Sequence, residues 1–327
     1  VEITGMDDED VFGKVFYSLP FGEAIKRELL TDYQVVIIGV DQPMIADWIE
    51  KRELLQTASG ETTDAESLAA QIGLFKAMKD YDLKRIISFH SRIKRAEIFA
   101  TDIQNSIDFI SKKQRPKGTV WTDFVSGKMS AHKRKTKLDQ LKDLSQGERG
   151  LLSNARCLSE GVDVPALDGV AFTDPKGSQV DIIQAVGRAI RLSQEKSVGT
   201  IFLPVFIQHG DDVESSILSS NFKPVWNVLN ALKSHDDVLS VELDKMRTNL
   251  GRKYFQGKII GIPKVILDLP QTIDKSFADS LKTVLVEQTT SSWNFWFGLL
   301  EDYVGKEGHD LLFQKTFQNE KSPLPTE

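Results

Sequence analysis

Short apolar runs alternate with longer segments of helical spacing along most of this chain. The clearest run, residues 34–40 (QVVIIGV), is continuous, which is typical of a parallel strand covered on both faces. Between residues 85 and 203 the same alternation predicts a parallel sheet with right-handed crossovers. The expected strands are residues 85–89, 119–125, 150–154, 169–172 and 199–203, and the expected helices are residues 92–110, 131–144 and 178–190.

The flanking segments follow other patterns. Residues 14–19 form a short β-like run, and residues 21–30 have helical spacing. Residues 41–82 carry two helical stripes and are expected to form a connector. Beyond residue 204 the alternation fades, and helical spacing is found in residues 225–232, 277–286 and 293–304.

The composition is that of an ordinary globular protein. Hydrophobic residues make up 40% and charged residues 27% of the 327 residues, a length that favours about two domains. The longest apolar run, residues 35–40, is far shorter than the roughly 20 residues that span a membrane. The single cysteine, Cys157, excludes an internal disulfide, and we expect no signal peptide at the start of the chain. We therefore expect a cytoplasmic protein without a membrane partner.

Charge is distributed unevenly along the chain. The formal net charge is −6, yet residues 112–137 carry nine Lys or Arg residues and one acid, Asp123. A basic segment on an acidic protein predicts a localised track for a polyanion such as nucleic acid. A solvated loop and helix face is the alternative.

Several familiar reaction centres are absent from the sequence. It contains no G-x-x-x-x-G-K-[ST] phosphate loop, no G-x-G-x-x-G, no H-E-x-x-H and no G-x-S-x-G. The five histidines lack metal-ligand spacing, and with one cysteine a zinc site is not expected. We therefore predict no metal ligands in this chain.

The most informative segment is residues 184–191 (QAVGRAIR). If it is helical, Gln184, Arg188 and Arg191 stand at i, i+4 and i+7 on one face, while apolar residues supply the opposite side. Two guanidinium groups and an amide on one face suit the oxygens of a phosphate. The alternative is a solvated cationic helix face.

A second candidate segment follows a predicted strand, where loops commonly form sites. Ser153 and Asn154 can hydrogen-bond a phosphate, and Gly161 permits close backbone approach. Asp163 offers a carboxylate to a hydroxyl pair such as that of ribose. The alternative for residues 161–165 is an ordinary turn.

In this order and spacing, these segments resemble the second RecA-like domain of a superfamily 2 helicase or translocase. Residues 86–92 (IISFHSR) resemble motif IV, residues 152–170 motif V and residues 184–191 motif VI. The turn at Ser126 and Gly127, followed by basic residues, resembles the segment after the next strand. In these features the chain is similar to the motor subunits of type I and type III restriction enzymes and to bacterial helicases with a helicase-associated domain.

The resemblance implies an α/β fold, a RecA-like parallel sheet flanked by helices, with a mostly helical C-terminal region. It also implies five segments. These are the end of a first RecA-like domain (1–40), a helical connector (41–82), the second RecA-like domain (83–207), a helical accessory region (208–288) and the start of a helicase-associated-like domain (289–327).

For individual residues, the resemblance implies roles in an ATP-dependent helicase. Arg188 and Arg191 would act as arginine fingers with Gln184 beside them, and Gly161 and Asp163 would approach the nucleotide. The expected partner is nucleic acid, double-stranded DNA by resemblance. Its contacts are assigned to His90, Ser91, Arg92, Ser126, Gly127, Ser153 and Asn154.

In that family the phosphate loop, and the carboxylates that hold most of the Mg²⁺ bound with ATP, belong to the first RecA-like domain. We expect that N-terminal domain to precede residue 1 and to be a partner of this chain, which alone should not hydrolyse ATP. The alternative is a non-enzymatic module that binds nucleic acid or recruits a partner on a degenerate helicase scaffold. An aromatic stripe at Trp293, Trp296 and Phe297 could stack bases, but its helical spacing favours a packed core.

Overall fold

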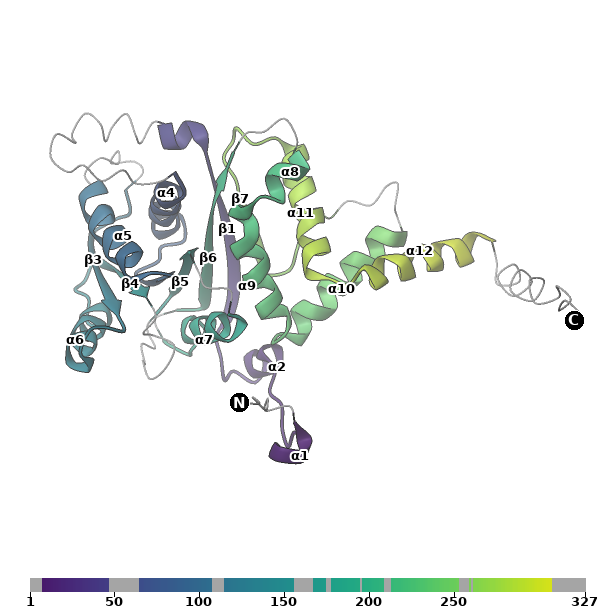
Figure 1. Ribbon diagram of the computed structural model, residues 1–327, viewed down its shortest axis with the longest axis horizontal. Coiled ribbons are helices and arrows are strands. Elements are labelled where there is room, and N and C mark those ends of the chain that lie inside the picture. The colour runs from purple at the N-terminus through teal and green to yellow at the C-terminus, as the bar shows by residue number, and fades with distance from the viewer. Residues whose placement is uncertain are drawn as a thin grey trace, which may run out of the picture.

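The computed structural model contains one parallel sheet of seven strands with helices on both faces (Figure 1). It describes residues 8–46, 65–107, 115–155, 167–174, 178–194, 196–208, 213–252, 259 and 261–307. The strands are β1 (Asp32–Asp41), β2 (Arg85–His90), β3 (Thr119–Ser126), β4 (Glu148–Ala155), β5 (Gly169–Asp174), β6 (Val198–Ile207) and β7 (Val265–Asp268). Their order is β3-β4-β2-β5-β6-β1-β7, and every pairing between them is parallel. The predicted α/β fold with a RecA-like parallel sheet is confirmed.

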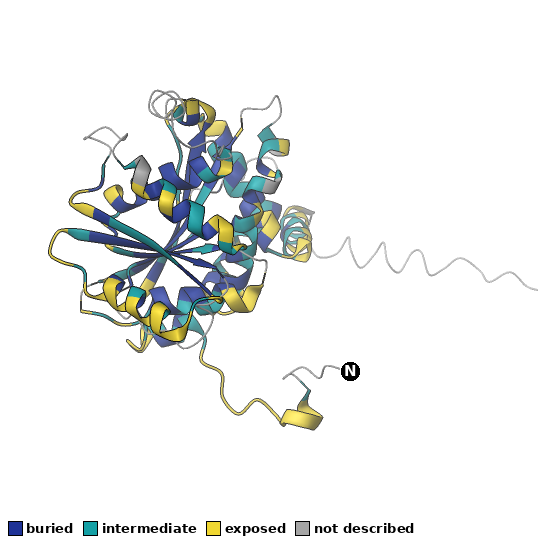
Figure 2. Ribbon diagram, turned by 60° about the vertical axis from the view of Figure 1, so that its left-hand side comes forward, coloured by how far each residue is buried: buried dark blue, intermediate teal, exposed yellow. Residues whose placement is uncertain are grey.

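Alternate residues of the central strands enter two separate cores, because successive side chains of a strand point to opposite faces. On β1, Val35 and Ile37 belong to one core, Val36 and Ile38 belong to the other, and all four are fully buried. Figure 2 shows this sheet as a buried layer between helices. The first core is covered by α6 (Ala131–Lys142), α7 (Gln179–Ala189), α9 (Lys223–Lys233) and α11 (Lys275–Thr289), and the second by α4 (Ala65–Asp80) and α5 (Ile93–Ser106).

Strand β1 lies inside this sheet. It pairs with β6 along its whole length, from Asp32 opposite Val198 to Asp41 opposite Ile207, and with β7 on its other side. The sheet is therefore not divided at residue 40, where the sequence suggested the end of a separate domain. An apolar run predicts a doubly covered strand, but it does not identify the neighbouring strands.

The segments around β1 also differ from expectation. Residues 14–19, all of them described, form no strand, and Val15, Phe16 and Tyr17 are exposed because no strand lies beside them. The preceding helix α1 (Glu9–Phe12) is short, and α2 (Phe21–Lys26) ends before residue 30. Ten residues of helix α4, in the expected connector, are buried, and eight of them belong to the second core.

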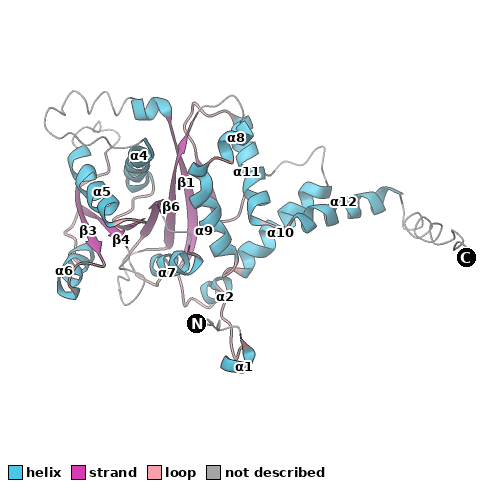
Figure 3. Ribbon diagram, in the orientation of Figure 1, coloured by secondary structure: helices cyan, strands magenta, loops and turns pink. Residues whose placement is uncertain are grey.

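Beyond β6 the described chain is mainly helical, as predicted, with β7 as an exception (Figure 3). Besides α9 and α11, this region contains α8 (Val213–Ile217), the 3₁₀ helix η1 (Ser220–Phe222), α10 (Asp237–Arg252) and α12 (Ser292–Glu307). Helices α10 and α12 cross closely because each has a glycine at the contact. A Cβ atom on Gly251 would lie 2.0 Å from the Phe295 carbonyl oxygen, and one on Gly298 would lie 2.0 Å from the Thr248 carbonyl oxygen.

The aromatic stripe of α12 is not a packed core. Trp293 and Trp296 are 67% and 62% exposed, and Phe297 is also exposed. The opposite side of α12 faces α10 through Phe295 and Gly298, so the stripe points away from that contact. None of the described helices is both long enough and apolar enough to cross a bilayer.

Candidate functional site

The carboxyl ends of β3, β4, β2 and β5 meet at one edge of the sheet, called here the strand-end edge. Ser126 of β3 lies opposite Ala155 of β4, and Asn154 of β4 lies opposite Phe89 of β2. In open α/β sheets, ligands bind beyond the carboxyl ends of the strands. This edge brings together the seven residues assigned above to nucleic acid: His90, Ser91, Arg92, Ser126, Gly127, Ser153 and Asn154.

These seven residues differ in exposure. Arg92 and Gly127 are exposed and Ser91 is half-buried, whereas His90, Ser126, Ser153 and Asn154 are buried. We expect the exposed turn residues to be those that touch a bound strand, and the buried ones to hold the turns in position. A direct contact with nucleic acid stays a prediction for all of them.

His90 is the centre of a buried hydrogen-bonded cluster that joins three strands. Its Nε2 lies 3.0 Å from the Ser88 Oγ, and its Nδ1 lies 3.1 Å from the Thr173 Oγ1. Ser88 also donates to the Ser153 Oγ at 3.1 Å, and the ring centroids of His90 and Phe99 are 4.7 Å apart. Burial lowers the pKa of His90 to about 4, so the imidazole is neutral at physiological pH.

Acid is therefore expected to destabilise the fold through His90. In the unfolded chain a histidine binds a proton below about pH 6.5, whereas folded His90 binds it only near pH 4. Stability from this group is complete above pH 6.5 and is lost as the pH falls towards 4, by about 3 kcal/mol. Urea unfolding at pH 7 and pH 4.5 measures the loss. His90→Gln should reduce the difference between the two pH values, and an unchanged difference would contradict this prediction.

Asp174, at the end of β5, ties the turn after β2 to the neighbouring strand. Its Oδ2 accepts a hydrogen bond from the Ser91 Oγ and lies 3.0 Å from the Arg95 Nη1. Sequence reasoning missed Arg95 as a partner of this turn. Its spacing of three residues from Arg92 at the start of a helix is the only signal that the sequence offers.

The second set of candidate residues, Gln184, Arg188 and Arg191, lies towards and just beyond the C-terminal end of α7. Ser178 caps the start of this helix by accepting a hydrogen bond from the Asp181 N–H, just after the strand-end edge. The helix then runs back across the sheet, because a Cβ atom on Gly199, at the start of β6, would lie 2.6 Å from the carbonyl oxygen of Ala189, the last residue of α7. Arg188 therefore lies near the amino end of β6. Arg188 is only 7% exposed. The Gln184 Oε1 is buried and has no hydrogen-bond partner among the described residues.

Arg191 differs from its predicted place, because α7 ends at Ala189. Arg191 instead forms an isolated antiparallel bridge with Leu30, just before β1. Thr31 fixes this bridge through its N–H, which donates to the Ile190 carbonyl at 2.8 Å, and its Oγ1, which donates to the Arg191 carbonyl at 3.2 Å. Of the three candidate residues, Gln184 and Arg188 therefore belong to α7, whereas Arg191 follows the end of the helix.

Lys196 joins this end of α7 to the chain that leads into β5. Its Nζ donates to the Ala189 carbonyl oxygen at 2.6 Å and to the Leu167 carbonyl oxygen at 2.5 Å. Leu167 directly follows the segment with Gly161 and Asp163, which lie outside the described residues. Leu167 therefore lies near the end of α7 that carries Arg188.

The surroundings of Lys196 are charged and partly buried. Burial lowers the pKa of Lys196 to about 8. It raises the pKa of Asp168 to about 6, although this carboxylate accepts hydrogen bonds from the Lys84 and Arg85 N–H groups, both at 2.8 Å. Sequence reasoning missed Lys196, because a single lysine in a polar loop carries no periodic signal. No group of three or more His, Cys, Asp or Glu side chains in the described ranges could hold a metal ion.

Comparison with known proteins finds similar chains among helicases. Residues 75–193 match the family model of the helicase conserved C-terminal domain. A protein of African swine fever virus named a probable helicase is 25% identical over 238 residues, which are 71% of this chain and 24% of the viral protein. A protein of Sulfolobus islandicus filamentous virus that also carries a helicase name is 24% identical over 226 residues, 68% of this chain and 38% of that protein.

A solved structure is also similar. The ATP-dependent Type ISP restriction-modification enzyme LlaBIII bound to DNA superposes with a TM-score of 0.69 at 25% sequence identity. The match covers 88% of this chain and 19% of that one. The chain thus spans about a quarter of the length of the African swine fever virus protein and less of LlaBIII.

Proposed function

Since this chain carries the C-terminal domain of a superfamily 2 helicase, we propose that it supplies the second RecA-like half of an ATP-dependent motor acting on DNA. The observation that carries the proposal is the position of Gln184 and Arg188 towards the same end of α7, within the residues that match the helicase C-terminal domain. Arg188 is only 7% exposed, which argues against the alternative of a solvated cationic helix face. LlaBIII is described as ATP-dependent and bound to DNA, which supports the same substrate classes here.

In this proposal the end of α7 stabilises charge during phosphoryl transfer. Arg188 and Arg191 donate hydrogen bonds to the oxygens of the γ-phosphate, where negative charge is redistributed in the transition state. Gln184 is assigned a place beside them, and its buried Oε1 accepts no hydrogen bond from the described residues. Gly161 and Asp163, which precede Leu167 and lie outside the described residues, are assigned to the nucleotide by the resemblance.

The metal requirement is assigned mainly to the other half of the motor. When bound with ATP, Mg²⁺ would neutralise part of the phosphate charge. No group of three or more His, Cys, Asp or Glu side chains among the described residues could hold a metal ion, and the carboxylates for Mg²⁺ are assigned to the phosphate-loop domain. The contribution of this chain is the pair of guanidinium groups and the amide.

The strand-end edge is proposed to hold the DNA backbone. Arg92, Gly127 and Ser91 are the accessible members of the set, and the buried His90 cluster keeps the turn after β2 in place. Phosphate contacts fix position without reading sequence. Because the two residue sets lie at opposite ends of α7, the strand is bound at the carboxyl ends of the sheet strands and the nucleotide near the amino end of β6. We expect the motor to work in the cytoplasm.

The 327-residue chain alone is expected to bind DNA weakly. It should also turn over ATP negligibly, because its sequence contains no phosphate loop. Phosphate release with and without DNA tests the second part, and fluorescence anisotropy at 50 and 200 mM salt tests the first. Addition of a polypeptide with the phosphate-loop domain should produce DNA-stimulated hydrolysis. Robust hydrolysis by the chain alone would overturn the proposal.

A second candidate function is recruitment of a protein partner, favoured by the exposed aromatic stripe of α12. Trp293 and Trp296 are more than half exposed, and large exposed apolar patches commonly mark interaction sites. The two functions are separable. Arg188→Ala should abolish ATP hydrolysis only in the motor, whereas Trp296→Ser should weaken partner binding in either case.

A further inference from the structure

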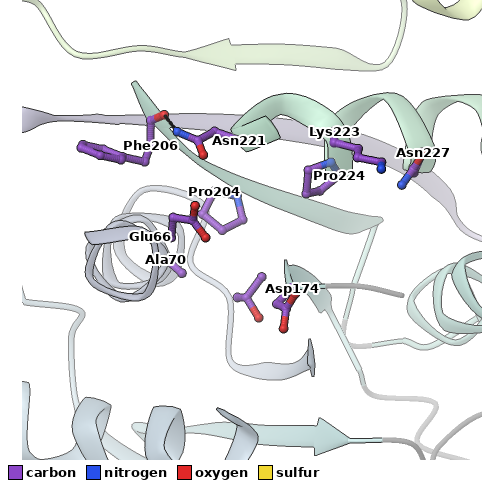
Figure 4. Close-up of a pocket in the computed structure, with 10 residues that line it drawn as sticks. Glu66, Ala70, Asp174, Pro204, Phe206, Asn221, Lys223, Pro224 and Asn227 are labelled. Atoms are coloured by element: carbon purple, nitrogen blue, oxygen red, sulfur yellow. Dashed lines mark hydrogen bonds between the residues drawn. The ribbon is translucent and has the colours of Figure 1, made fainter. Parts of the chain in front are cut away.

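A pocket of about 460 Å³ opens at the strand-end edge, next to Thr173 and Asp174 (Figure 4). It lies where β5 and β6 end, between the first turns of α4 and α9. Its volume falls within the range of roughly 300–1,000 Å³ that is usual for pockets binding small ligands. Neither the helicase family model nor the motif residues extend to its α9 wall, since the model match ends at residue 193.

The apolar surface of the pocket is suited to a flat ring. Pro204 from β6 and Pro224 from α9 both line it, together with the buried Phe206. Asn221 is anchored beside them, because its Nδ2 donates to the Phe206 carbonyl oxygen at 3.1 Å. Proline rings present apolar faces on which any planar base can pack, so this contact does not distinguish one base from another.

Polar groups of both signs surround this apolar surface. Glu66 and Asp174 supply carboxylates, which accept hydrogen bonds from exocyclic amino groups of bases. Asn227 supplies an amide that both donates and accepts. Lys223, exposed on the first turn of α9, supplies a cation for a phosphate. In Figure 4, Glu66 lies on α4, Asp174 at the end of β5, and Lys223 and Asn227 on α9.

From this arrangement we propose that the pocket takes one unstacked nucleotide of the bound strand. The base packs on Pro204 and Pro224 with its amino group towards the carboxylates, and its phosphate meets Lys223. The inference rests on the proposed function, because the strand has to reach this edge. Asp174 connects the pocket to the residues assigned to the strand. It lines the pocket, and it also binds Ser91 in the turn after β2 and Arg95 in α5.

The proposal has a consequence for base preference. Adenine, cytosine and guanine carry an exocyclic amino group, whereas thymine carries none. A cytosine strand should therefore bind more tightly than a thymine strand, although both are pyrimidines and stack weakly. Glu66→Gln should reduce this preference, because an amide is a poorer acceptor than a carboxylate.

The test uses the full 327-residue chain and 12-nucleotide single strands. A 2-aminopurine placed at successive positions becomes brighter where it is unstacked, so one position should brighten on binding. Asn227→Leu should abolish that signal. In Lys223→Ala the loss of affinity between 50 and 200 mM salt should become about threefold smaller, as expected for one lost phosphate contact on a single strand.

Lys245→Ala is the matched control, because Lys245 is exposed on α10 and pairs only locally with Glu242 among the described residues. It should keep both the 2-aminopurine signal and the wild-type salt dependence. If Lys223→Ala and Asn227→Leu behave like this control while the chain still binds DNA, the pocket proposal is overturned and the proposed function stands. If wild-type chain binds no strand at all, both are overturned. If CMP alone occupies the pocket and strands do not, a bound strand is not the occupant.

Discussion

Arg188→Ala is expected to lower DNA-stimulated ATP hydrolysis by at least about 10³-fold in a protein that joins this chain to a phosphate-loop domain. The guanidinium would supply charge to the γ-phosphoryl group at the moment when charge moves between its oxygens. Phosphate release under saturating ATP and DNA measures the effect. Binding of DNA should stay close to wild type, because the strand-end edge lies at the other end of α7.

Two controls separate this effect from a loss of fold. Arg252→Ala removes an exposed arginine that pairs with Glu301 between α10 and α12, and it should leave hydrolysis unchanged. Arg188→Lys keeps the charge but lacks the planar fork of donors, so it should restore little activity. Nearly full hydrolysis by Arg188→Ala, with an unchanged melting temperature, would favour the non-enzymatic module.

The strands that were predicted correctly from the sequence are those with short apolar runs, which are typical of strands buried on both faces. Five strands between residues 85 and 207, and β1, were predicted within a few residues, because each is flanked by strands or covered by helices. The same pattern could not assign β1 to its sheet, since pairing with β6 and β7 is a long-range property. Strand β7 was missed because four residues are too few to show a period.

The candidate site was predictable in part for similar reasons. Parallel topology alone brings strand ends together, so the grouping of Ser126, Asn154 and His90 followed from the sequence. The burial of His90 did not follow, because it depends on hydroxyl groups from β2, β4 and β5 that meet only in one register. The role of Lys196 likewise depends on two carbonyl groups that lie far apart in sequence.

The exposed aromatic stripe of α12 shows a limit of periodicity. Helical spacing of apolar residues predicts that one face is covered, but it cannot say by what. Here α10 covers the face with Gly298, and the face with Trp293 and Trp296 is left exposed in the described chain. The apolar residues of α12 therefore lie on two faces, of which only one packs against another described helix.

The basic helix α6 is expected to carry a large share of the salt dependence of DNA binding. Its N-cap Ser130 lies just after the Ser126–Gly127 turn, so the helix begins at the strand-end edge. Lys137 pairs with Asp123, whereas Lys133 and Lys135 are exposed, as is Lys128 before the helix. The basic track predicted from residues 112–137 thus has an accessible part on α6, and residues 112–114 lie outside the described chain.

A Lys128→Ala/Lys133→Ala/Lys135→Ala variant should therefore lose three phosphate contacts. Each contact contributes about 0.9 to the slope of log affinity against log salt for duplex DNA, so the slope should fall by about 2.7. Between 50 and 200 mM salt this makes the loss of affinity roughly 40-fold smaller than in the wild type. Fluorescence anisotropy with a labelled duplex at several salt concentrations gives both slopes.

The matched control carries Lys26→Ala, Lys245→Ala and Lys306→Ala, three exposed lysines on α2, α10 and α12. Both variants change the formal net charge from −6 to −9, because each removes three cations (−6 − 3 = −9). A general charge effect would weaken both variants equally, and that outcome would refute a localised track. A lower slope in the α6 variant alone would show that DNA lies along α6, since only local phosphate contacts release counterions there.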